Sequence, residues 1–269
     1  MERNRYISGV KVLFGAALIL STVERSSSLD GLLRCAARSG NEDLAVFFVS
    51  SHNANINAVD VERKTALHHA VKCGNREIVS FFISQGGDPN AVDAQGYNAL
   101  HYAILSRNIG IIDLLAPRMD INRVDLSGNS PINAVYSSRK ANAIKQVDVI
   151  KRLRFYGADV NIRNRCGFAL LHLAVRVGDV DSVEYLMREQ AETNWANGSG
   201  QTPLDMALDM ALRANHTDSD IRIVFLLLEY FAVTNKYTVV EGRQGGDDHI
   251  LIGRAYPHSK DHTYSIKKI

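Results

Sequence analysis

The stretch Lys64–Asn75 (KTALHHAVKCGN) contains two adjacent histidines and a cysteine four residues after the second. On a helix, His69 and Cys73 would share a face. An imidazole and a thiolate placed together can ligate zinc, or they can form a nucleophile with its base. A zinc site needs a third and a fourth ligand at a recognisable spacing, however. Whether the pattern occurs once or recurs therefore decides between chemistry and structure.

The pattern recurs. Similar stretches are NALHYAILSRN (98–108), ALLHLAVRVGD (169–179) and TPLDMALDMAL (202–212). The slot of the first histidine is filled in successive copies by Arg34, His68, His101, Asn133, His172 and Asp205. A catalytic histidine is needed once, whereas a structural histidine recurs with the repeat. We therefore interpret this slot as structural and expect neither catalysis nor metal binding from His68, His69 or Cys73.

The spacing of the copies defines a period. The closing asparagines of the blocks are Asn57, Asn90, Asn122, Asn161, Asn194 and Asn235, which are 33, 32, 39, 33 and 41 residues apart. A period near ~33 is typical of a stacked repeat protein. Blocks such as TPLD (202–205) and GADVN (157–161) match the ankyrin pattern T-P-L-H-x-A followed by G-A-D-x-N. Residues 29–235 therefore resemble a set of ankyrin repeats.

The resemblance implies an all-α ankyrin-repeat solenoid of about six helix-turn-helix repeats with β-hairpin loops. The expected repeats are residues 29–57, 58–90, 91–122, 123–161, 162–194 and 195–235. The resemblance also implies that His68 bonds Thr65 and neighbouring backbone; Asn98 and Ala169 replace this threonine in two copies. Gly74 and Gly86 should end the two helices of the second copy. A leucine at one equivalent position of four first helices should be buried: Leu67, Leu100, Leu171 and Leu204.

The two ends of the chain depart from the period. Residues 1–28 carry basic residues before an apolar run, Val12–Leu20, which suits either a secretory signal or a helix that caps the first repeat. The run is too short to span a bilayer as a helix. Residues 236–269 contain two β-type runs, YTVVE and HILIG, around a glycine-rich turn. We expect a C-terminal hairpin against the last repeat, or a tail.

Composition limits the function classes. The chain has 269 residues, of which 46% are hydrophobic and 22% charged, as in folded soluble proteins. A net charge of +2 gives no reason to expect a nucleic-acid partner. Three cysteines without a C-x-x-C spacing favour a reducing compartment. We therefore expect a cytoplasmic monomer without cofactor or stable membrane insertion, or an exported protein if the N-terminal segment is a cleaved signal.

No enzyme motif emerges from the sequence. GSGQT (198–202) has Gln201 where a phosphate-binding loop needs lysine, and no Gly-x-Ser-x-Gly turn occurs. We therefore expect a non-enzymatic scaffold that binds a protein partner through the concave groove of the repeats. Alternatives are an inhibitor of a Rel-type transcription factor and an exported effector. The binding residues that the resemblance implies are Lys64, Lys72, Tyr97, Leu105, Leu126, Arg165, Phe168 and Arg176.

Two copies are longer than the others. The extra residues lie near 136–148 in the fourth copy and near 208–221 in the last. Insertions in repeat proteins go to loops and often belong to a binding face, but we favour neutral drift of a surface loop as their explanation. The insertion at 136–148 is therefore the alternative to the groove as the binding site.

Overall fold

The structure is a computed structural model. It describes residues 29–137, 144–213, 215–230, 237–244, 247–254 and 264–267. The chain divides into two compact units: residues 29–126 belong to the first, and Ser127–Ser137 with the described residues from Ile144 onward belong to the second. The expectation of an N-terminal cap or signal falls on residues 1–28, which lie outside the described residues.

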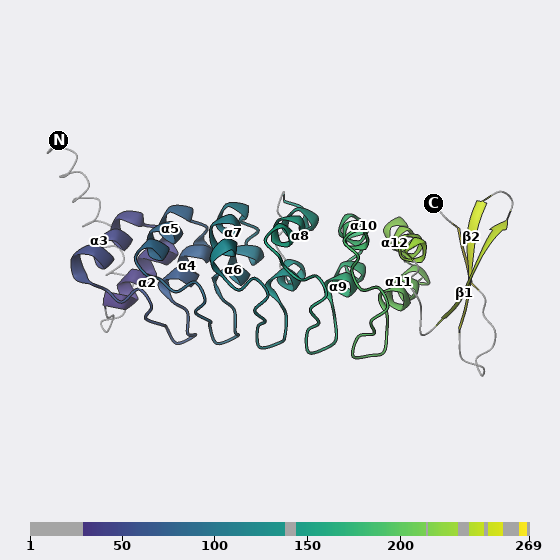
Figure 1. Ribbon diagram of the computed structural model, residues 1–269, viewed down its shortest axis with the longest axis horizontal. Helices are drawn as coiled ribbons and strands as arrows, with labels where there is room; N and C mark the ends of the chain where they lie inside the picture. The colour runs from purple at the N-terminus through teal and green to yellow at the C-terminus, as the bar shows by residue number, and fades with distance from the viewer. Residues whose placement is uncertain are drawn as a thin grey trace. The chain divides into compact units, whose positions relative to one another are not determined.

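The first unit consists of paired antiparallel helices. The pairs are α2 (Leu29–Ser39) with α3 (Glu42–His52), α4 (Ala66–Cys73) with α5 (Arg76–Ser84), and α6 (Ala99–Leu105) with α7 (Ile109–Leu115), followed by the short 3-10 helix η1 (Ala116–Arg118). Figure 1 shows that the first helix of each pair lies in one layer and the second in another, with long loops projecting beyond the first helices.

The second unit repeats this layering. Its elements are η2 (Pro131–Tyr136) with α8 (Gln146–Phe155), α9 (Leu170–Arg176) with α10 (Val180–Arg188), and α11 (Pro203–Ala211) with α12 (Asp218–Glu229). The first helix of the fourth copy is a 3-10 helix rather than an α-helix. Its sequence, PINAVY, is rich in residues of low helix propensity, and the inserted segment follows directly.

The second copy shows how the sequence sets its helix ends. Thr65 is the N-cap of α4, and Gly74 ends that helix with a φ of 88°. Asn75 then caps α5, because its side-chain oxygen accepts the backbone N–H of Ile78. Gly86 follows α5 with a φ of 84°, in the left-handed region that glycine enters without strain. The predicted roles of both glycines are confirmed.

The core is formed where the helix layers meet. Leu67, Leu100, Leu171 and Leu204 are each no more than 1% exposed, as predicted. Burial of one such side chain contributes about 1.5–3 kcal/mol. The alanines at the point of closest helix approach, Ala70, Ala103, Ala174 and Ala207, are equally buried. The solenoid prediction therefore identifies the core positions correctly in both units.

The C-terminal region forms an antiparallel sheet. The strands β1 (Tyr237–Gln244), β2 (Asp247–Arg254) and β3 (Tyr264–Lys267) are hydrogen-bonded in the order β1-β2-β3. The first two form the predicted hairpin, with Val239 opposite Ile252. The third strand, paired through Ile252 and Tyr264, was not predicted. Packing of the hairpin against the last repeat stays a prediction.

Membrane insertion was not expected from the sequence. Among the described residues, no helix has both the length and the apolar character that a bilayer crossing requires.

Candidate interaction surface

In each unit, the hairpin loops and the exposed parts of the first helices form a surface that the sequence predicts to bind a partner. We use the name hairpin surface for these residues in either unit. The loops are residues 60–64, 93–97, 125–129, 164–168 and 197–201. In the first of them, Asp60 N donates to the Lys64 carbonyl at 3.0 Å. Asp60 Oδ1 in turn accepts the N–H groups of Glu62 and Lys64, both at 2.9 Å. A short acceptor side chain at the loop's first position therefore holds the tip closed.

Neighbouring loops are also hydrogen-bonded within each unit. In the first unit, Ala94 N donates to the Glu62 carbonyl at 2.9 Å, and Leu126 N to the Gln95 carbonyl at 3.1 Å. In the second unit, Arg165 N donates to Ser127 at 3.0 Å and Gly198 N to Cys166 at 2.8 Å. Backbone contacts of this kind hold adjacent loops in a fixed register.

The recurring histidine slot anchors these loops to the helices. The Thr65 backbone N–H donates to His68 Nδ1 at 3.1 Å, and Thr65 Oγ1 lies 2.9 Å from the same nitrogen. His68 Nε2 then donates to the Tyr97 carbonyl of the next loop at 3.1 Å. Burial lowers the pKa of His68, so the neutral ring that this pattern requires is favoured. The predicted bond is confirmed, and the opening question is answered: this histidine is structural.

Copies without the threonine keep the backbone part of this contact. Asn98 N and Ala169 N each donate to Nδ1 of the histidine three residues later at 3.3 Å. In the last repeat Asp205 takes the slot, and Thr202 N and Oγ1 donate to its Oδ2 at 2.9 and 3.0 Å. Any hydrogen-bond acceptor at this slot, an imidazole or a carboxylate, can therefore bind the backbone N–H of the residue three positions earlier.

A second tether joins each loop of the first unit to its own helix. His69 Nε2 donates to Asp60 Oδ2 at 2.9 Å, and in the next copy Tyr102 Oη donates to Asp93 Oδ2 at 2.6 Å. Burial lowers the pKa of His69, although Asp60 opposes the shift. His69 and Tyr102 each come directly after the histidine slot in their copies. This shared position could have predicted that both side chains bond the Asp at the start of the loop. The bond to Asp60 accounts for His69 without metal or catalysis.

In the first unit, two of the predicted binding residues, Lys64 and Tyr97, each lie near the ring of Tyr102. Lys64 Nζ lies 2.5 Å from Glu62 Oε2 and 5.8 Å from the ring centre of Tyr102. The ring of Tyr97 is half-buried, lies 6.1 Å from that of Tyr102 and stacks on His101 with 5.1 Å between centres. Lys64 is less accessible than predicted, with a side chain only 13% exposed. Tyr102 was missed by the sequence analysis.

The other predicted residues of the first unit differ in accessibility. Leu126 is 59% exposed at the tip of its loop. Lys72 is exposed on α4, whereas Leu105 is half-buried at the end of α6. Lys72 is therefore open to a partner, and Leu105 can offer only part of its side chain.

The second unit combines a cation and a ring at the corresponding positions. The guanidinium of Arg176, exposed at the end of α9, lies 5.3 Å from the ring centre of Phe168. Phe168 is half-buried and meets His172 edge-on at 5.8 Å. Arg165 is exposed at the loop tip. The prediction placed Phe168 and Arg176 on one surface, and the structure brings them into contact.

A second cation–ring pair was not foreseen. The guanidinium of Arg163 lies 4.9 Å from the ring centre of Trp195, which is 37% exposed. These residues come from adjacent repeats; Arg163 directly precedes its loop, and Trp195 lies two residues before the start of its own. No short sequence pattern contains both residues. The only sequence signal for this contact is that they are about one repeat length apart.

The hairpin surface presents aromatic rings and cations. Within the described ranges, no group of three or more His, Cys, Asp or Glu side chains is arranged to hold a metal ion. Cys35, Cys73 and Cys166 are free thiols, the last two exposed. What the surface offers is aromatic rings with cations held over them, on loops fixed by backbone hydrogen bonds.

Comparison with known proteins identifies the repeats. The family model for ankyrin repeats (3 copies) matches residues 32–125 and 139–238, which is more than half of the chain. The zebrafish (Danio rerio) protein named "Putative palmitoyltransferase ZDHHC13" is 29% identical over 178 residues, 65% of this chain and 27% of its own length. Ankyrin repeat and SOCS box protein 11, also of Danio rerio, is 34% identical over 93 residues, 34% of this chain and 29% of its own length.

These relatives are much longer than the matched region, since the chain spans under a third of each of them. The ankyrin fold is typically non-enzymatic, and a match to 27% of a palmitoyltransferase does not carry that protein's activity to this chain. Ankyrin repeats are generally protein-interaction modules. With its period, its loop geometry and the match of the family model, the chain belongs to the ankyrin-repeat family.

Proposed function

We propose that this protein is a non-enzymatic scaffold that binds a protein partner through the hairpin surface. The partner-facing residues are those predicted from the sequence together with Tyr102, Arg163 and Trp195. Support comes from the family, whose members are generally interaction modules. It also comes from the way loops are held in register within each unit, because a preorganised surface loses little conformational entropy on binding.

The observation that carries this proposal is the pairing of cations with rings in both units. Lys64 lies over Tyr102 in the first unit, and Arg176 over Phe168 in the second. An exposed cation over a ring, such as Arg176, keeps its charge available while its stem and the ring present apolar area. A partner segment with carboxylates next to apolar side chains would satisfy both groups. The proposed partner is therefore an acidic, partly apolar protein segment.

The second unit contributes more of this binding in our proposal. Arg163, Arg165 and Arg176 are all exposed there, whereas Lys64 in the first unit is largely covered and already paired with Glu62. Arginine and exposed aromatic rings are the residues most often found at binding hot spots. Phe168 and Arg176 should therefore dominate the affinity.

We further propose that the protein acts as a monomer in the cytoplasm. The free cysteines are compatible with a reducing compartment. The N-terminal residue of the mature chain tests this part: an intact Met1 supports the cytoplasm, whereas a start near residue 25 supports export and contradicts it.

The binding proposal is tested in two steps. Affinity purification of the full chain followed by mass spectrometry identifies a partner. Calorimetry then compares the wild type with Phe168→Ala and Arg176→Gln, which should each weaken binding by about 1–3 kcal/mol. Arg188→Gln, on the exposed side of α10, is the matched control and should bind normally. Equal affinity of all four proteins would contradict the proposal.

Tyr97 requires a milder substitution than alanine. Its ring stacks on the buried His101, so Tyr97→Ala would remove a packing contact as well as a binding group. Tyr97→Phe keeps the stack, and thermal unfolding of this variant alongside the binding measurement separates the two effects.

A further inference from the structure

Three arginines lie on the hairpin surface of one repeat in the second unit. Arg163 and Arg165 flank the first position of the loop, Arg176 is the last residue of α9, and all three side chains are exposed. The sequence from Arg163 to Val177 contains no Asp or Glu. Within the described ranges, none of the three guanidiniums lies within 4.0 Å of a carboxylate oxygen. Their positive charges are therefore not neutralised by the protein.

The loop of this repeat also lacks a negative charge that loops of the first unit carry. In the first unit, Asp93 Oδ1 accepts two N–H groups of its loop, at 2.8 and 2.9 Å. In the second unit, Asn164 Oδ1 accepts the two equivalent N–H groups, both at 3.0 Å. The amide of Asn164 therefore closes the loop in the same way without placing a carboxylate between Arg163 and Arg165.

The first helix of the next repeat carries two carboxylates, and both already accept hydrogen bonds. Asp205 is buried and accepts bonds from Thr202 at 2.9 and 3.0 Å. Asp209 is half-buried and accepts a bond from Gln201 Nε2 at 2.8 Å. Neither forms an ion pair with the arginines of the preceding repeat.

Aromatic rings hold two of these guanidiniums in place. Arg163 lies 4.9 Å from the ring centre of Trp195, and Arg176 lies 5.3 Å from that of Phe168. A ring attracts a guanidinium without neutralising its charge, so the N–H donors remain available for an anion. Val177, which directly follows Arg176, is 51% exposed and adds apolar area. This surface therefore suits a strongly anionic group next to an apolar one.

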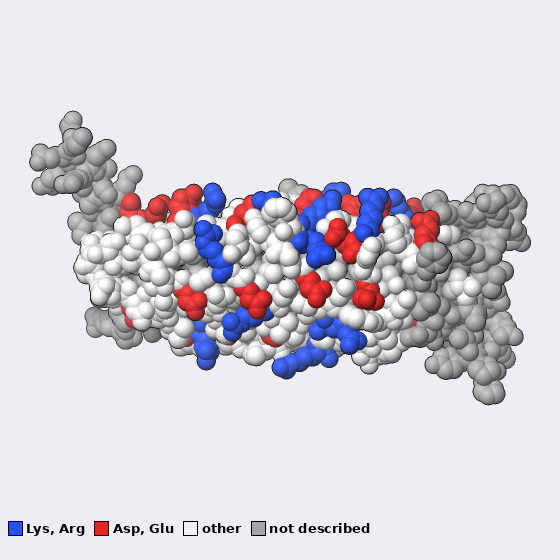
Figure 2. Space-filling model, viewed as in Figure 1, with Lys and Arg blue, Asp and Glu red and all other residues white. Residues whose placement is uncertain are grey.

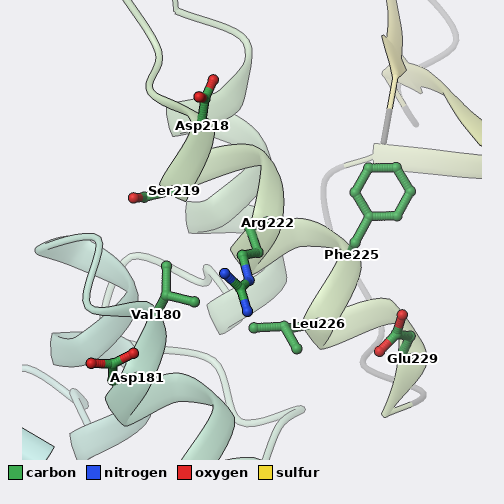
Figure 3. A pocket seen from close by; sticks show the side chains of 8 residues that line it. All are labelled: Val180, Asp181, Asp218, Ser219, Arg222, Phe225, Leu226 and Glu229. Carbon is green, nitrogen blue, oxygen red and sulfur yellow. The ribbon is translucent and has the colours of Figure 1, made fainter. Parts of the chain in front are cut away.

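Arg222 of the same unit shows the contrasting case. It lines a hollow between α10 and α12 together with three carboxylates, those of Asp181, Asp218 and Glu229 (Figure 3). Three carboxylates with one guanidinium leave no excess of positive charge in that hollow. Arg222 is also exposed, so it provides a matched control for the arginines of the hairpin surface.

We infer that the anionic group is a phosphate, and that the partner binds through a phosphorylated side chain next to an apolar residue. This inference rests on the proposed function, because it concerns the same surface. A phosphate carries a charge of about −1.5 to −2 at pH 7 and three acceptor oxygens, which is more charge and one more oxygen than a carboxylate offers. The planar fork of arginine matches these oxygens. Confinement of the three cations to one repeat suits a single phosphate rather than the backbone of a nucleic acid.

Fluorescence of Trp195, the single tryptophan of the chain, reports directly on this surface. The probe is a peptide, blocked at both ends, with one phosphothreonine between two leucines; it is titrated into the full chain. We expect a Kd on the order of 0.1 mM. The same peptide with glutamate in place of phosphothreonine should bind about tenfold more weakly, and with unmodified threonine more weakly still.

Three outcomes of this titration would overturn the inference. They are the absence of a saturable signal, equal binding of the phosphothreonine and glutamate peptides, and tighter binding of a short single-stranded oligonucleotide than of the phosphothreonine peptide.

Variants of the full chain test which groups bind the phosphate. Arg176→Gln should weaken the phosphothreonine peptide about tenfold, and Arg222→Gln should leave it unchanged. Asn164→Asp keeps the loop acceptor and adds a carboxylate between Arg163 and Arg165, so it should also weaken the peptide. Thermal unfolding checks that each variant is folded. Unchanged binding by both Arg176→Gln and Asn164→Asp would contradict the inference.

Phosphatase treatment of the purified partner separates this inference from the proposed function. We expect the treated partner to lose affinity for the wild type. A partner that requires Arg176 but binds equally well after the treatment would leave the proposed function standing and overturn the inference.

Discussion

The two units share a framework and differ in their second helices. In the first unit, α3 carries Glu42, Asp43 and His52, and the ionisable residues of α5 and α7 are Arg76, Glu77 and Asp113. In the second unit, ion pairs join neighbouring second helices, such as Arg154 with Glu189 at 3.1 Å. Figure 2 shows Lys, Arg, Asp and Glu side chains intermixed over α8 and α10.

This difference distinguishes the features that the repeat fold requires from the surface positions at which the sequence can vary. Loops closed by a first-position Asp or Asn and hydrogen bonds between neighbouring loops occur in both units. These features follow from the geometry of one repeat on the next. The exposed side of a second helix has no such requirement, so its charges can vary.

The largest expected effect tests whether the units respond separately. Leu67→Ala in the first unit and Leu171→Ala in the second each remove a buried side chain and should cost about 2–5 kcal/mol. Because repeats couple mainly to their neighbours, amides near the substitution should lose protection first. Urea unfolding with hydrogen exchange measures both quantities. Uniform loss of protection along the chain would show that the units do not act as local stacks.

The next effect compares two loop glycines with nearly the same backbone. Gly96 has a φ of +82° and Gly200 a φ of +76°. A Cβ on Gly96 would lie 2.8 Å from Leu126 N, whereas a Cβ on Gly200 would meet nothing within 4 Å. Gly200→Ala should cost about 1–2 kcal/mol from the left-handed backbone alone, and Gly96→Ala about 1–3 kcal/mol more. Equal losses in urea unfolding would mean that contact between loops does not matter.

A pH effect should appear in both units. Burial lowers the pKa of His68 and of His172 below the ordinary value of 6.5. The unfolded chain therefore binds protons first, and stability is full above pH 6.5 and is lost as the pH falls through 6.5 toward the folded pKa. Urea unfolding between about pH 7.5 and 5.5 should show this loss. His68→Asn with His172→Asn should make the loss of stability smaller and leave the part that His69 contributes. An unchanged loss would show that His68 and His172 are not its source.

The smallest expected effect is a stabilisation in each unit. Arg63 and Gln190 have φ values of 60° and 57°, at positions where other copies have glycine, such as Gly96 and Gly157. Arg63→Gly and Gln190→Gly should relieve this strain, offset in part by the greater freedom of glycine in the unfolded chain. A net gain below about 1 kcal/mol is expected in thermal unfolding. A loss would indicate that the side chains stabilise the loops by other contacts.

Much of the fold could be predicted because its signals are local and recur. Thr65, Gly74 and Gly86 mark helix ends by their own backbone preferences, and the slot of His68 repeats with the period. The 3-10 helix at Pro131–Tyr136 was missed, because the repeat pattern predicts an α-helix where the local sequence disfavours one.

The candidate site was less predictable for a different reason. Phe168 and Arg176 were identified from slots that vary within the family, and their contact follows from helix geometry. The pairing of Arg163 with Trp195 depends on side chains from different repeats. No local pattern reports such contacts, since they arise only when the repeats are stacked.

Hydrogen exchange of the full chain, free and bound to its purified partner, tests the central claim most directly. The account predicts slower exchange in the hairpin loops and first helices, over residues 60–73, 93–106 and 164–177, with the strongest effect around Phe168 and Arg176. The exposed side of α5 should change little. Protection confined to residues 136–148, with the loops unchanged, would contradict the account and make the insertion the binding site.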